Sequence, residues 1–102
     1  MIAISRFRIE EAEVGPQVAG LAEAAAFFRG RPGCLSAEVV QNLDDPALWA
    51  LVSHWDEVGS YRRGFNGYDA KMILTPVLSY ALDEPGAYAA PDEVGTNRPR
   101  AS

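Results

Sequence analysis

Residues 47–55 constrain the fold more than any other part of the chain, because they read as a strand that is apolar on both faces. Successive side chains of a strand point to opposite sides, which places Leu51 and Trp55 on one face and Leu48 and Val52 on the other. A chain of 102 residues has the size of one domain, with no room for a second core. We therefore expect helices to cover one face of this strand and a second subunit to cover the other.

The remaining apolar segments set the order of the elements. The predicted elements are a strand over 1–9, a helix over 16–29, strands over 34–43 and 47–55, a helix capped by Asp56 that continues to about residue 65, a helical segment over 70–82 bent at Pro76, and a short strand over 86–90. Turn residues at 44–46 join the second and third strands into a hairpin. The order is βαββαβ, which predicts an α+β, ferredoxin-like domain with helices on one face of an antiparallel sheet.

The domain is expected to span residues 1–90. From residue 91 to 102 the chain has two prolines and no apolar periodicity, which predicts a flexible C-terminal tail. The formal net charge is −5, from 9 Lys and Arg against 14 Asp and Glu, and an acidic surface argues against a nucleic-acid partner. The chain has no run of about 18 consecutive apolar residues, so no membrane span is predicted. Arg6 and Arg8 interrupt the first apolar stretch, so no signal peptide is predicted, and we expect a cytoplasmic protein.

The sequence predicts no metal site and no disulfide. Cys34 is the single cysteine and His54 the single histidine, too few for a metal-binding cluster. Arg29 and Arg31 lie near Cys34 in sequence and could activate its thiol, but a small apolar residue at the start of a strand is the simpler interpretation.

Five short segments resemble the antibiotic biosynthesis monooxygenase family. They are residues 5–8 (SRFR), 29–34 (RGRPGC), 44–46 (DDP), 51–55 (LVSHW) and 60–62 (SYR). The resemblance covers about residues 1–90 and implies a dimeric α+β barrel built from two ferredoxin-like subunits. The family includes cofactor-free oxygenases of anthrones and quinols, haem-degrading enzymes and many proteins without an assigned activity, so the fold carries over better than the chemistry.

The resemblance implies two catalytic residues. Trp55 matches a tryptophan that lines the pocket of anthrone-oxidising members, where an indole offers an N–H and a flat surface; the alternative is a core tryptophan. Tyr61 matches a second pocket residue, whose phenol can bond a substrate oxygen or exchange a proton with it; the alternative is a ring packed on the sheet. Leu51 stands where the family pattern has an asparagine, and Gln41 or Asn42 on the neighbouring strand could replace it.

The sequence matches the haem-degrading members of the family poorly. Its first-strand asparagine would fall on Ser5 and its axial histidine near Asn66, so the resemblance predicts no cofactor. His54 is expected on the opposite face from Trp55, and it could act as a base only if the strand were offset by one residue.

The predicted function is a cofactor-independent monooxygenase acting on a hydrophobic aromatic small molecule of the phenol, quinol or anthrone type. The predicted assembly is a homodimer through the sheet face. The alternative is a non-catalytic dimeric binding or accessory protein of secondary metabolism, which Leu51 favours. An isomerase, lyase or cyclase on the same barrel is left open. A pocket above roughly 300 Å³ with Trp55 and Tyr61 pointing inward would favour a small-molecule site.

Overall fold

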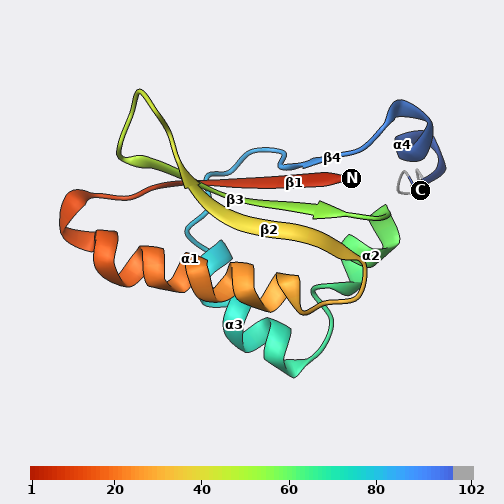
Figure 1. The fold of residues 1–102 in the computed structure, drawn as a ribbon, viewed down its shortest axis with the longest axis horizontal. Coiled ribbons are helices and arrows are strands. Elements are labelled where there is room, and N and C mark those ends of the chain that lie inside the picture. The colour runs from red at the N-terminus through yellow and green to blue at the C-terminus, as the bar shows by residue number, and fades with distance from the viewer. Residues whose placement is uncertain (98–102) are drawn as a thin grey trace.

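The computed structural model describes the backbone of residues 1–97 and the side chains of residues 1–95. The elements are β1 (Ile2–Arg8), a 3₁₀ turn η1 (Glu11–Glu13), α1 (Val14–Arg29), β2 (Cys34–Gln41), β3 (Leu48–Trp55), α2 (Val58–Arg63), α3 (Tyr68–Leu78), β4 (Ala87–Tyr88) and α4 (Pro91–Asn97) (Figure 1). No helix in this described part of the chain is long and apolar enough to cross a membrane.

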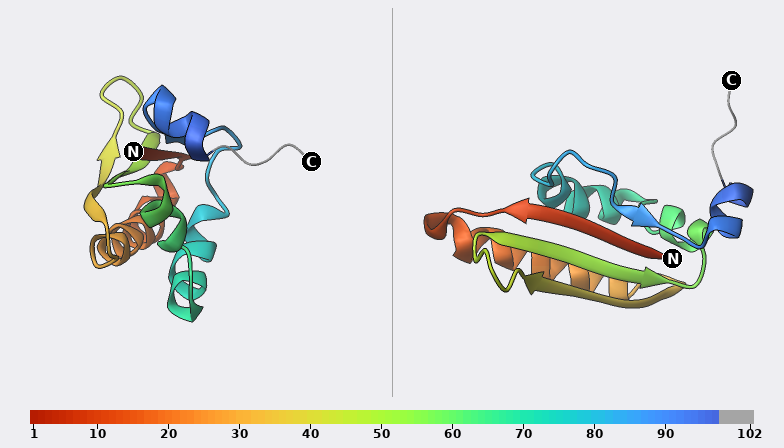
Figure 2. Two further views of the ribbon diagram at one scale, coloured as in Figure 1. Left: turned by 90° about the vertical axis from the view of Figure 1, so that its right-hand side faces the viewer. Right: turned by 90° about the horizontal axis from the view of Figure 1, so that it is seen from above.

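The four strands form one antiparallel sheet in the order β2-β3-β1-β4. The long helix α1 and the shorter α3 lie on the same side of this sheet, as the views in Figure 1 and Figure 2 show. The element order and strand order are those of the ferredoxin-like fold, which confirms the predicted fold class.

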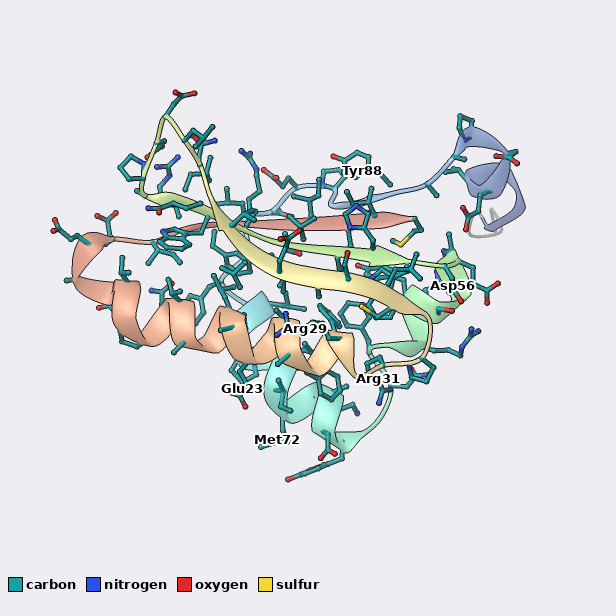
Figure 3. All side chains as sticks on the ribbon, in the orientation of Figure 1. Glu23, Arg29, Arg31, Asp56, Met72 and Tyr88 are labelled. Atoms are coloured by element: carbon teal, nitrogen blue, oxygen red, sulfur yellow. The ribbon has the colours of Figure 1, made fainter. Side chains whose placement is uncertain are left out.

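Strand alternation sorts the side chains as predicted. Leu51 and Trp55 are buried at 2% and 1% exposure against the helices, while Val52 and His54 are half-buried on the opposite face. The core between the sheet and the helices consists of Phe7, Ile9, Leu21, Ala24, Ala25, Phe28, Ala37, Leu51, Trp55, Ala70 and Leu74. We call the opposite side of the sheet the open face. Figure 3 shows Tyr88 on that side, and Arg29 and Met72 on the helix side.

The start of the second helix differs from the prediction. The helix α2 begins at Val58 with Glu57 at the N-cap, so the predicted cap at Asp56 is wrong. The backbone N–H of Asp56 is bonded to the carbonyl of Gly33 at 2.9 Å, which continues the pairing between β3 and the start of β2 by one residue. Asp56 therefore lies between β3 and α2, where it is bonded to Gly33, rather than in the helix.

The C-terminal elements also differ from the prediction. The helix α3 starts earlier and ends earlier than the expected segment 70–82, and Pro76 lies inside its last turn. A short helix, α4, occupies the first part of the segment expected to be a tail without regular structure. The flexibility predicted for 91–102 stays a prediction, and residues 98–102 lie outside the described residues.

Candidate functional site

A cavity of about 230 Å³ lies between the sheet and the helices. Its walls come from β1, β3, α1, α2 and the end of α3. The lining residues are Ala3, Ser5, Phe28, Leu51, Ser53, Tyr61, Phe65, Leu78 and Ala81. The volume is below the roughly 300 Å³ at which typical ligand pockets begin, so only a small or flat molecule fits without movement of the walls.

The polar groups of the cavity are three hydroxyls, from Ser5, Ser53 and Tyr61. Burial raises the pKa of the Tyr61 phenol above its ordinary value, so this group stays protonated near neutral pH and acts as a hydrogen-bond donor. The lining includes no carboxylate, histidine, lysine or arginine. The site can therefore donate hydrogen bonds to a substrate oxygen, but its walls hold no side chain suited to take a proton at neutral pH.

Trp55 lies behind the cavity wall. Its side chain is 1% exposed, and its indole N–H donates a hydrogen bond of 2.9 Å to the hydroxyl oxygen of Ser53. Its ring packs edge-on against Phe28 and Tyr61, with centroid distances of 5.5 and 5.9 Å. The indole thus supports two groups that line the cavity, Ser53 and Tyr61. The direct catalytic contact expected for Trp55 stays a prediction, whereas Tyr61 lines the cavity itself.

The helix α2, which carries Tyr61, is held at both ends. At its start the carboxylate of Glu93 in α4 accepts a 3.0 Å hydrogen bond from the N–H of Val58. At its end the guanidinium of Arg31 donates to the carbonyls of Arg63 and Asn66, at 3.1 and 2.9 Å. These contacts join segments far apart in sequence, and they fix where the phenol of Tyr61 enters the cavity.

Gly64 allows the end of α2 to approach the ring of Trp55. A Cβ atom at this position would lie 2.8 Å from Cη2 of Trp55, closer than real contacts allow. Phe65, the next residue, packs edge-on against Phe28 and Tyr61 at 5.6 and 5.1 Å. The cavity wall is therefore an aromatic cluster whose spacing depends on one glycine.

Three other candidates lie elsewhere. His54 is on the open face, where its Nδ1 lies 3.1 Å from the hydroxyl of Ser36, and its register opposite Ile2 shows no offset that would turn it toward the cavity. Gln41 bonds the carbonyl of Pro46 at 2.7 Å, and the side-chain oxygen of Asn42 accepts two backbone N–H bonds in the hairpin turn. Neither amide lines the cavity, so neither replaces the family's asparagine there.

Cys34 is half-buried, and burial raises the pKa of its thiol, which favours the simpler interpretation of a packing residue. Among the described residues, no group of three or more His, Cys, Asp or Glu side chains could hold a metal ion.

Sequence reasoning missed the hydroxyls of Ser5 and Ser53 as cavity groups. The available signal was strand alternation, since Ser53 shares a face with Trp55 and Ser5 shares one with Phe7. Alternation shows the face on which a residue lies, but not whether the opposing helices leave a space above it.

A ferredoxin-like domain with a small hydroxyl-lined cavity under its sheet defines the structural class of this protein. The sequence model for antibiotic biosynthesis monooxygenases matches residues 1–63, and the chain belongs to this family. Among proteins with curated functions, none matches the sequence significantly.

Solved structures share the fold. A mutant of SnoaB, a cofactor-independent oxygenase from Streptomyces nogalater, is similar with a TM-score of 0.73 and 20% identity, over 88% of this chain and 91% of that chain. A family protein from Deinococcus radiodurans has a TM-score of 0.72 and 19% identity, over 87% and 90% of the two chains. Another from Chloroflexus aurantiacus has a TM-score of 0.59 and 27% identity, over 81% and 84%.

Proposed function

We propose that this protein is a cytoplasmic, cofactor-independent monooxygenase that oxidises a small aromatic phenol, quinol or anthrone in the cavity under the sheet. The observation that carries the proposal is the lining: apolar and aromatic walls with three hydroxyls and no protein base. Family membership and the fold shared with SnoaB, itself a cofactor-independent oxygenase, support the same class of reaction.

In this chemistry the substrate supplies the electrons. An anthrone loses a proton to give an aromatic oxyanion, which transfers electrons to O₂ and forms a carbon–oxygen bond at the ring carbon. The two C–H bonds of that carbon are replaced by one C=O bond, one oxygen atom enters the product, and the other leaves as water. The protein needs to hold the flat substrate, exclude bulk water and stabilise the oxyanion.

The hydrogen-bond donors for the oxyanion are Tyr61 and Ser53. The phenol of Tyr61 stays protonated because burial raises its pKa. The Ser53 oxygen already accepts the indole N–H of Trp55, so its own O–H is left to donate into the cavity. Trp55 thereby orients Ser53, and loss of the indole N–H is expected to weaken catalysis through Ser53.

The experiment is oxygen uptake by chelator-treated protein with a tricyclic anthrone, compared with autoxidation without protein. We expect Tyr61→Phe and Ser53→Ala each to lower the catalysed rate by about 100- to 1000-fold, as loss of an oxyanion donor does. Tyr68→Phe is the matched control, because Tyr68 is a 74% exposed tyrosine outside the cavity. Uptake no faster than autoxidation, or equal loss in the Tyr68 control, would refute the proposal.

The pH dependence tests the absence of a protein base. With no base in the lining, the catalysed rate should rise with pH as the substrate itself ionises, and its midpoint should follow the substrate when anthrones of different acidity are compared. A midpoint near pH 6 to 7 that stays the same for every substrate would point to a protein group such as histidine instead.

A second candidate is a non-catalytic small-molecule-binding protein. It is favoured by Leu51, which lines the cavity where the family pattern has an asparagine, and by the small volume of the cavity. This protein would bind the anthrone without accelerating oxygen uptake, so titration calorimetry beside the oxygen assay separates the two functions.

We also propose a homodimer formed through the open face. Ile2, Ile4 and Val52 lie there half-buried on neighbouring strands, and a second sheet would remove them from water. We expect light scattering to give a dimer at micromolar concentration and Val52→Asp to give a monomer. Met72→Asp is the control, because Met72 is 57% exposed on the helix side of the molecule (Figure 3). A stable wild-type monomer would refute the proposed assembly.

A further inference from the structure

A second and larger cavity opens between α1 and α3 and shares no lining residue with the first. Its volume is about 540 Å³, within the range of small-molecule sites. Its floor is formed by Phe7, Ile9 and Leu21, which are 1–2% exposed and belong to the core. We call this cavity the interhelical cleft. It lies on the helix side of the sheet, so a dimer through the open face leaves it accessible.

The close approach of the two helices defines one end of the cleft. A Cβ atom on Gly20 would lie 3.3 Å from the Cγ2 atom of Val77, so α1 and α3 are in contact there. Apart from Leu21 in the floor, the other lining residues of α1 lie toward its N-terminus, at Pro16 and Gln17, and Pro76 lines the facing side. The cleft therefore extends from the Gly20 contact toward the start of α1, with apolar side chains on its floor and on both walls.

The polar groups of the interhelical cleft are a carboxylate, an amide and a phenol, from Glu13, Gln17 and Tyr80. None of these side chains has a hydrogen-bond or ion-pair partner within the described part of the chain. The ring of Tyr80 is 69% exposed, and no lysine or arginine lines the cleft. These groups offer one negative charge, one aromatic surface and an amide to a ligand.

The charged groups at the mouth of the cleft determine whether a cationic or an anionic ligand is favoured. The N-terminus of α1 carries about half a positive charge from its peptide dipoles, which by itself would favour an anion. Glu13 stands at this N-terminus with a full negative charge, and Glu10 and Glu11 lie in the same turn. The carboxylates outweigh the helix dipole, so the mouth of the cleft is negative.

We propose that the interhelical cleft binds a hydrophobic primary amine. The aromatic or alkyl body lies on the apolar floor, and the ammonium group remains at the mouth, where it pairs with the Glu13 carboxylate and contacts the ring of Tyr80. An anion of the same shape would be repelled by the carboxylates, and a neutral molecule would gain only the apolar contact.

The test compares three probes of one shape: 2-naphthylmethylamine, 2-naphthylmethanol and 2-naphthoate. Binding is followed by amide chemical shifts in the full chain, which also locates the probe. We expect saturable shifts at Gly20 and Val77, with the amine bound tighter than the alcohol and the carboxylate weakest. Shifts centred instead on Ser53 and Phe65 would place the amine in the cavity under the sheet and overturn the proposal.

Charge variants test the role of Glu13. Glu13→Gln should weaken amine binding by about two- to fivefold, as expected for an exposed ion pair, and leave alcohol binding unchanged. Glu11→Gln is the matched control, because Glu11 lies in the same turn but does not line the cleft. Equal effects of the two variants, or no preference of the wild type for the amine, would overturn the proposal.

A filling variant separates this site from the proposed oxygenase site. Gln17→Trp places an indole at the mouth of the cleft and should abolish amine binding, while anthrone oxygen uptake stays at the wild-type rate. Unchanged amine binding in a folded Gln17→Trp protein would overturn the cleft assignment, whatever the outcome of the oxygen assay.

Discussion

The hydrogen bond between Trp55 and Ser53 links the core to the candidate site, and its contribution to stability can be measured. Both residues are 1% exposed, and the Nε1–Oγ distance is 2.9 Å. In Ser53→Ala the indole N–H loses its only acceptor in the described structure and stays buried. A buried donor without a partner costs about 1–3 kcal/mol, so we expect the free energy of unfolding to fall by this amount.

A double-mutant cycle separates this hydrogen bond from the packing of the two side chains. In a Trp55→Phe background the N–H is already absent, so the same Ser53→Ala change should cost about 1 kcal/mol less than it does in the wild type. The assay is urea unfolding followed by far-ultraviolet circular dichroism, because Trp55→Phe alters the fluorescence. All variants are compared at one protein concentration, since dimer formation would make the stability depend on it.

Two outcomes of the cycle would refute the reasoning. An equal cost of Ser53→Ala in both backgrounds would mean that the hydrogen bond contributes nothing specific. A cost of Ser53→Ala no larger than that of Ser79→Ala would mean that the burial of the hydroxyl is unimportant. Ser79 is the control because it is exposed and bonds only the carbonyl of Pro76, so its loss should cost about 0.5 kcal/mol or less.

The positive φ angles of Gly33 (86°) and Gly67 (100°) predict a backbone strain of about 1–3 kcal/mol for alanine at either position. A Cβ on Gly33 would also collide with the side chains of Ser60 and Asp56, whereas a Cβ on Gly67 would have no neighbouring atom within 4 Å. Urea unfolding should therefore show a larger loss of stability for Gly33→Ala than for Gly67→Ala. The guanidinium of Arg6 pairs with both oxygens of Glu84 at 2.7 Å and lowers the pKa of that carboxyl. A lowered folded-state pKa gives stability that is present above the ordinary carboxyl pKa and lost as pH falls. Arg6→Gln should therefore lower the melting temperature near neutral pH and leave it unchanged at about pH 2, and a difference that persists in acid would contradict this assignment.

The strands and helices of the fold could be predicted because local sequence patterns indicate where most of them begin and end. The two-sided apolar strand β3 (Leu48–Trp55), the turn at 44–46 and the helix stop near Gly30 each act over a few residues, and the turn places β2 beside β3 in the sheet. The helix α4 could not be predicted in this way. Glu93 in α4 caps Val58 across 35 positions of sequence, and no local pattern in the tail indicates that contact.

The sequence predicts on which face of the sheet each residue of the candidate site lies, but not the hydrogen bonds between these residues. Alternation along β3 places Ser53 and Trp55 on the helix side, and it also allows an indole to reach the hydroxyl two residues away on the same face. A sequence pattern that assigns a tryptophan to a pocket cannot show whether its N–H is already donated inside the protein. Here that donation orients Ser53, and the register places Ser5 directly opposite Leu51, the position at which the family pattern has an asparagine. The polar groups of this cavity thus come from two strands and α2. A comparison of this sequence with the family pattern, made one position at a time, therefore finds the missing asparagine but not the hydroxyls on the other elements.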